Sequence, residues 1–146
     1  MVIYLPGAGR LAQALREELD ALRALIGTLH RERDALNRAD TEALSKVVEE
    51  KLAAAEAVAA WSRARRNAIA RCGGSSGHRV TAITENRDLT AAVEATAGGA
   101  AMLNDSNEAL LVRHTTRILR TALLRDAPSA REKRDAGPAL LIVAGR

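Results

Sequence analysis

The strongest constraint on the fold is a run of leucines spaced by seven in the first quarter of the chain. Its apolar positions, which alternate mostly at intervals of four and three, are Leu15, Leu19, Leu22, Ile26, Leu29 and Leu36. Apolar residues at these intervals line one side of an α-helix and pack in the manner of a coiled coil. The chain therefore begins with a long amphipathic helix that requires helical partners.

Composition extends this prediction to the whole chain. Of its 146 residues, 47% are hydrophobic, yet there is no Phe, one Trp and one Tyr. Ala, Leu, Arg and Glu favour helices, whereas the β-branched and aromatic residues that strands prefer are scarce. We expect an all-α protein, built as an elongated, antiparallel, coiled-coil-like bundle of three main helices with thin seams of Leu and Ala.

Breakers and caps divide the chain into segments. The predicted segments are an irregular lead-in, a single helical domain and a C-terminal tail, at residues 1–9, 10–126 and 127–146. The helices of that domain are expected at about residues 10–37, 41–71 and 79–126. Asp40 or Thr41 would cap the second helix. Because neither Gly nor Pro occurs before it, the sequence leaves open whether residues 38–41 kink the chain or reverse it.

Two later features concern the third helix and the tail. Gly98 and Gly99 lie inside the third helix, where each costs about 1 kcal/mol relative to Ala. We expect a break there, or a place where another helix approaches closely. The apolar run from Ala139 to Ala144 is too short to cross a membrane, and the sequence leaves open whether it docks on the bundle.

The sequence predicts a cytoplasmic protein without stable insertion in a membrane. The first residues lack the basic start of a signal peptide. Cys72 is the single cysteine, so it cannot form an intramolecular disulfide, and nothing indicates an oxidising compartment. The formal net charge of +4 comes from 22 basic and 18 acidic residues that are mostly interspersed, which is a weak signal for an anionic partner.

No set of residues predicts catalysis, a cofactor or a metal site. The Pro6–Gly9 segment resembles a phosphate-binding loop only superficially, because it lacks a preceding strand and the lysine of a P-loop. His30, His78 and His114 have no Cys, Asp or Glu neighbour at the usual metal-ligand spacing. No nucleophile, base and orienting group form a recognisable set. We expect a protein that is not an enzyme.

The candidate site is the segment from Leu103 to Leu124, which as a helix carries two apolar rows. One row consists of Leu103, Leu111, Ile118 and Ala122. The second row, about 100° further round the helix, consists of Val112, Leu119 and Leu123. Since one row suffices to dock on a bundle, we expect Leu111 and Ile118 to pack inward and the second row to be offered to a partner protein. The predicted partner-binding residues are Leu103, Asn107, Leu110, Leu111, Val112, Arg113, Arg117, Ile118, Leu119, Arg120 and Leu123.

Three arginines, Arg113, Arg117 and Arg120, form a stripe beside the second row. One interpretation is a solvated face, and another is an electrostatic rim around an apolar docking groove. Nucleic acid is a third interpretation, but aromatic residues that stack on bases and a recognisable DNA-binding motif are both lacking. We therefore expect a protein partner and no nucleic acid.

The sequence resembles the FlgN family of flagellar export chaperones from about Leu11 to Gly137. In the first half, the resemblance rests on the leucine heptads followed by Glu32, Leu36, Asp40, Leu44 and Lys51. In the second half, it rests on LNDSNEALL from Leu103 to Leu111, which is similar to the family's paired-asparagine segment opening its C-terminal helix. Arg134 departs from the pattern, because it stands where the family often has a tyrosine linked to the export gate.

This resemblance implies a cytosolic, substrate-specific chaperone of flagellar type III secretion. Such a protein binds the C-terminal helices of the hook–filament junction proteins, also called hook-associated proteins, and delivers them to the export apparatus, including its gate or ATPase components. The resemblance also implies that the client contacts lie in the C-terminal helix. The alternative is a structural coiled-coil scaffold that self-associates through the same apolar rows and has no export role.

Overall fold

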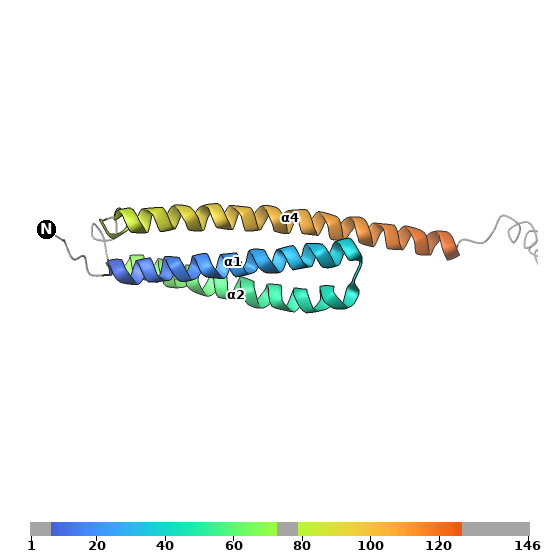
Figure 1. Cartoon of the computed structure of the whole chain (residues 1–146), viewed down its shortest axis with the longest axis horizontal. Helices are drawn as coiled ribbons and strands as arrows, with labels where there is room; N and C mark the ends of the chain where they lie inside the picture. Colours follow the sequence, from blue (N-terminus) through green and yellow to red (C-terminus); the bar gives the residue numbers. More distant parts are fainter. Residues whose placement is uncertain (1–6, 73–78, 127–146) are drawn as a thin grey trace, which may run out of the picture. The chain divides into compact units, whose positions relative to one another are not determined.

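The computed structural model describes residues 7–72 and 79–126. Three long helices make up most of this part, namely α1 (Ala8–Arg38), α2 (Thr41–Cys72) and α4 (Thr84–Asp126) (Figure 1). No strand occurs among the described residues, and the all-α class is confirmed. The predicted tail at 127–146 and residues 1–6 of the predicted lead-in lie outside the described residues. The chain divides into two units within α4, between Leu110 and Leu111.

The leucine heptads of α1 form the core of the first unit. Leu15, Leu22, Leu29 and Leu36 are each at most 4% exposed. Val93 of α4 is buried in one cluster with Leu15 and Leu22, and partly buried side chains of α2 pack against that cluster. Because burial of one leucine side chain contributes about 2 kcal/mol, these four leucines contribute on the order of 8 kcal/mol to the unit's stability.

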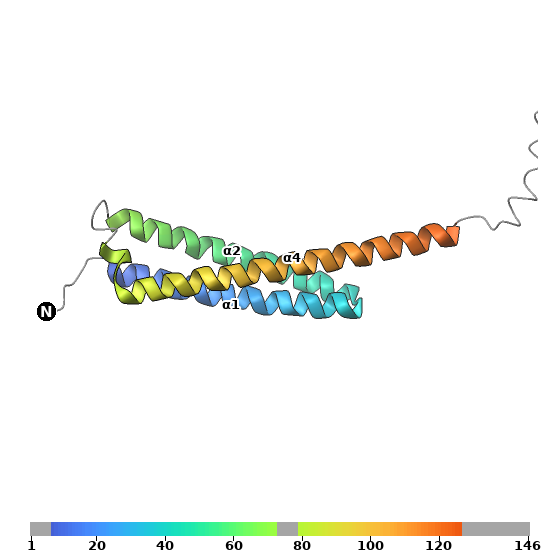
Figure 2. The same ribbon diagram turned by 90° about the horizontal axis from the view of Figure 1, so that it is seen from above.

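Contacts between the helices show how the first unit is threaded. Between α1 and α2, the ion pairs are Glu18–Arg65, Arg31–Glu50 and Glu32–Lys51. From the Glu18–Arg65 pair to the other two pairs, the residue number rises along α1 and falls along α2, so these two helices are antiparallel. Between α1 and α4, the polar contacts include Arg16–Glu85, Glu32–Asn107 and Arg33–Ser106. These numbers rise together, so consecutive helices run up, down and up, and α1 packs against both of the others (Figures 1 and 2).

The chain reverses direction between α1 and α2, which settles the question that the sequence left open. Ala39 adopts the left-handed conformation at φ 52°, a place usually taken by glycine. Its N–H donates to the Leu36 carbonyl at 3.1 Å, and the Asp40 N–H donates to the Ala35 carbonyl at 3.0 Å. The Asp40 carboxylate then accepts the Ala43 N–H at 3.0 Å and caps α2, as predicted.

The structure differs from the sequence prediction at two places in α4. Helical structure does begin at residue 79, but a turn and a bend at Ala82 and Ile83 separate residues 79–81 from α4, which begins at Thr84. The Asn86 side chain donates to the Val80 carbonyl at 2.8 Å across this interruption. The predicted break at Gly98 and Gly99 is wrong, since α4 is continuous through both. The alternative prediction, that another helix approaches closely at these glycines, is wrong as well, because a Cβ at either glycine would meet nothing within 4 Å.

Within the first unit, α4 buries a seam that sequence reasoning missed. Its buried residues are Asn86, Val93, Ala100 and Asn107, which recur at intervals of seven. Two asparagines and an alanine carry little hydropathy, so an apolar pattern does not reveal the seam. The heptad spacing itself was the available signal.

Candidate partner-binding site

A polar cluster joins the three helices of the first unit at the start of the predicted site. We call Glu32, Lys51 and Asn107 the three-helix polar cluster. The Lys51 ammonium lies 3.1 and 3.2 Å from the two Glu32 carboxylate oxygens. The Asn107 amide nitrogen donates to Glu32 at 2.9 Å and to the Leu29 carbonyl at 2.8 Å. Each member comes from a different helix, so the cluster sets the register of all three.

This cluster changes the interpretation of the first part of the predicted site. Asn107 is only 1% exposed, and both hydrogens of its amide are used inside the bundle. Leu103 and Leu110 are half-buried. Asn107 therefore serves the packing of α4, and the exposed part of the predicted site begins at Leu111.

From Leu111 onward, both apolar rows of α4 are exposed. Leu111 and Ile118, which were expected to pack inward, are 44% and 68% exposed, so that expectation is wrong. Val112, Leu119 and Leu123 are 64%, 58% and 73% exposed, in line with the expected outward row.

The two rows form one continuous surface. At 100° per residue, Ile118, Leu111, Leu119, Val112 and Leu123 fall within an arc of about 140°. We call these five residues the α4 apolar face. Large apolar side chains that gather on one face of a soluble helix and remain exposed mark a site of interaction. The breadth of the arc suits a partner helix, because helical partners present anchors at i, i+3, i+4 and i+7.

Arginines border one side of the α4 apolar face. Arg113, Arg117 and Arg120 lie on the adjacent side of the helix, and each is exposed. Within the part of the chain that the structure describes, none of them forms an ion pair. Unpaired cations beside an apolar face favour a partner that carries acidic residues on its flank, and they favour the orientation that brings these residues to the cations.

The helical backbone around this face depends on local interactions. Between Leu111 and Arg125, every residue is exposed except His114, which is half-buried. The Thr115 and Thr121 hydroxyls donate to the carbonyls four residues earlier, Leu111 and Arg117, at 3.0 and 2.9 Å. A helical segment of this length that buries little surface is marginally stable in water. The segment is thus suited to gain order from a partner.

A cavity of about 400 Å³ in the first unit was not predicted from the sequence. Its walls come from all three helices and include Leu25, Ala55, Ala97 and Ala101. Asn104 also lines it, and the Asn104 side-chain oxygen is buried without a hydrogen-bond partner among the described residues. Alanines on the facing helices were the signal in the sequence for this cavity. Because alanine is common in helices, that signal does not identify a particular site.

The other candidates from the sequence form no site. His30 is exposed, His114 is half-buried, and His78 and Pro6 lie outside the described residues. Among the residues that the structure covers, no cluster of His, Cys, Asp and Glu could hold a metal ion. None of the described helices contains a stretch long and apolar enough to cross a membrane. Arg134 and the run from Ala139 to Ala144 also lie outside the described residues.

Comparison with known proteins gives one match. A family model described as FlgN protein matches residues 1–130. The match covers α1, α2 and α4 entirely, and therefore both the three-helix polar cluster and the α4 apolar face. No curated protein and no solved structure shows significant similarity to the chain.

Proposed function

The chain belongs to the FlgN family of flagellar export chaperones, and from this premise we propose the client and the surface that binds it. The proposed clients are the hook–filament junction proteins, held in the cytoplasm through their C-terminal helices. The proposed site is the α4 apolar face with its rim of arginines. After binding, the chaperone delivers the client to the export apparatus, where gate or ATPase components are the proposed receivers.

The observation that carries this proposal is the exposure of the α4 apolar face. Its five large side chains are between 44% and 73% exposed. Covering each of them contributes about 1 to 2 kcal/mol, or on the order of 5–10 kcal/mol in all. Part of this free energy offsets the cost of association and of ordering the helix. The remainder corresponds to moderate affinity, which suits a chaperone that must release its client.

The arginine rim supports a helical client with an acidic flank. Arg113, Arg117 and Arg120 have no acidic partner within the described chain. A client helix that lays its apolar side on the α4 apolar face would bring its flanking carboxylates to these guanidinium groups. Because such exposed pairs are screened by salt, client affinity should fall moderately as ionic strength rises.

The test compares two aspartate variants of matched exposure. Leu119 lies on the α4 apolar face and is 58% exposed, whereas Leu52 lies on α2 and is 64% exposed. A charge placed inside an apolar contact costs at least about 2 kcal/mol, so L119D should weaken binding of a hook-associated C-terminal fragment by about 30-fold. L52D should bind like the wild type. Titration calorimetry measures both affinities, and circular dichroism verifies that both variants remain helical.

Equal client binding by wild type and a folded L119D protein would contradict the proposed site. The scaffold alternative is favoured by the same exposed face, since two copies can cover each other. Light scattering separates the two functions. A stable oligomer that L119D disperses, together with absent client binding, would assign the face to self-association.

A further inference from the structure

The arginines of this chain are distributed unevenly along it. Residues 1–16 and 57–84 contain no Asp or Glu. The same stretches contain seven arginines, namely Arg10, Arg16, Arg63, Arg65, Arg66, Arg71 and Arg79. A further stretch of this kind lies in α4, where residues 109–125 contain four arginines and no Asp or Glu, whereas acidic and basic residues are mostly interspersed in the rest of the chain.

The fold brings these stretches together at one end of the first unit. The start of α1 meets the end of α2 so closely that a Cβ built on Gly7 would lie 2.6 Å from the Cys72 sulfur. Val80 joins Leu11 in the core beside them. Two of the seven arginines are paired, Arg16 with Glu85 and Arg65 with Glu18. The other five form no ion pair with any described residue, which leaves this end strongly cationic.

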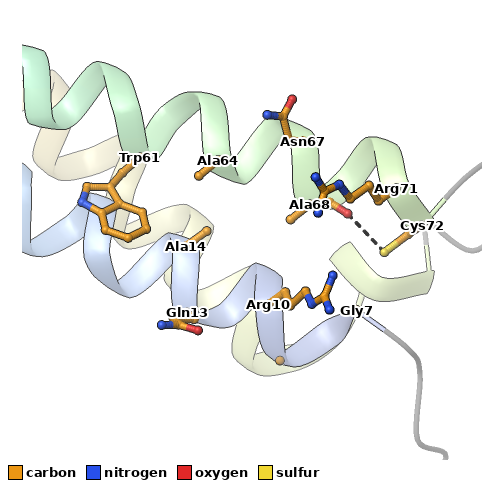
Figure 3. A pocket seen from close by; sticks show the side chains of 11 residues that line it. Gly7, Arg10, Gln13, Ala14, Trp61, Ala64, Asn67, Ala68, Arg71 and Cys72 are labelled. Atoms are coloured by element: carbon orange, nitrogen blue, oxygen red, sulfur yellow. Dashed lines mark hydrogen bonds between the residues drawn. The ribbon is translucent and has the colours of Figure 1, made fainter.

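A groove of about 900 Å³ opens between α1 and α2 at this end (Figure 3). Arg10 lines it from α1 and Arg71 lines it from α2. The indole of Trp61 lies between the two helices, and Ala14 and Ala68 form apolar wall. The amides of Gln13 and Asn67 also line the groove. We call this the basic groove.

We propose that the basic groove binds an acidic, partly apolar peptide segment of a second partner protein. Guanidinium groups match carboxylates in geometry and charge, so Arg10 and Arg71 would hold acidic side chains. The Trp61 indole and the alanine wall would receive an apolar side chain between them. The Gln13 and Asn67 amides can each donate to and accept from an extended peptide backbone. This site is distinct from the α4 apolar face.

The lining favours a peptide over other anionic partners. Binding of single-stranded nucleic acid uses several aromatic platforms, whereas the groove contains Trp61 alone and the chain has one further aromatic residue. Alanine walls and side-chain amides add nothing to the recognition of a membrane surface, but both suit a short segment with alternating apolar and acidic residues.

The experiment titrates the full-length protein with a fluorescent peptide of alternating glutamate and leucine. Trp61 is the single tryptophan, so its fluorescence reports occupancy of the groove directly, and anisotropy of the peptide gives the affinity. The R10Q/R71Q double variant should bind at least about 10-fold more weakly, because it loses two charge-assisted contacts. R38Q/R87Q removes the same net charge outside the groove and should bind like the wild type. R10K/R71K should retain part of the affinity.

Several results would overturn the proposal. They are an absence of peptide binding, equal binding of the matching lysine–leucine peptide, and equal losses in the groove and control variants. Tighter binding of a DNA duplex or of phosphatidylglycerol vesicles, dependent on Arg10 and Arg71, would assign the groove to those anions instead. Because L119D leaves the groove intact, it should bind the peptide normally. Client binding and peptide binding can therefore fail independently of each other.

Discussion

Replacing Lys51 by methionine removes the cation from the three-helix polar cluster while retaining most of the side chain's volume. Glu32 would remain with an 8% exposed side chain and with Asn107 as its one remaining partner in the cluster. Breaking a fully buried ion pair costs about 3–5 kcal/mol. Lys51 is 26% exposed, so water already screens part of the interaction. We therefore expect a loss of about 2–3 kcal/mol in the free energy of unfolding.

Urea unfolding followed by circular dichroism measures this loss, and two further variants isolate its cause. Lys46 forms a pair with Glu42 in which the side chains are 72% and 84% exposed, so K46M should cost less than about 0.5 kcal/mol. The double variant E32Q/K51M removes both charges but keeps a side-chain oxygen that can accept from Asn107, and should recover to within about 1 kcal/mol of the wild type. The reasoning is refuted if K51M is as stable as K46M, or if the double variant loses the sum of the single effects.

Three further predictions concern the backbone, two of them in α4 and one at Gly7, which precedes α1. Gly98→Ala and Gly99→Ala should each raise the free energy of unfolding by about 1 kcal/mol, since a Cβ at either position meets open space. Gly7→Ala should instead lower it by about 1–2 kcal/mol, because Gly7 has φ +94° and faces Cys72. Thermal unfolding compares the three, and a destabilised Gly98→Ala protein would show that α4 needs its flexibility for folding. Amide hydrogen exchange should be much faster at residues 112–125 than at 86–107, and equal protection would show that the exposed segment is not marginal.

Local interactions explain why the helices could be predicted so closely. Heptads in α1 predicted its buried face, because any helix with that spacing must bury the same side. The Asp40 cap was predictable since its carboxylate satisfies an N–H of the next helix whatever the chain does beforehand. The reversal at Ala39 was not, because alanine rarely adopts the left-handed conformation. Packing of α1 against α2 stabilises the reversed chain, and no local signal in the sequence indicates this stabilisation.

In the candidate site, too, local sequence predicted some features and tertiary packing decided others. The sequence by itself determined that α4 carries apolar side chains over a broad arc and a stripe of arginines, because helix periodicity alone places them. Only the tertiary structure decided which of them are used inside the bundle. Asn107 is buried because Glu32 and the Leu29 carbonyl offer it partners from another helix. Leu111 and Ile118 fall on the same side of the helix as Asn107, yet they are 44% and 68% exposed. Burial depends on what stands opposite a side chain, and a helical pattern contains no information about its partners.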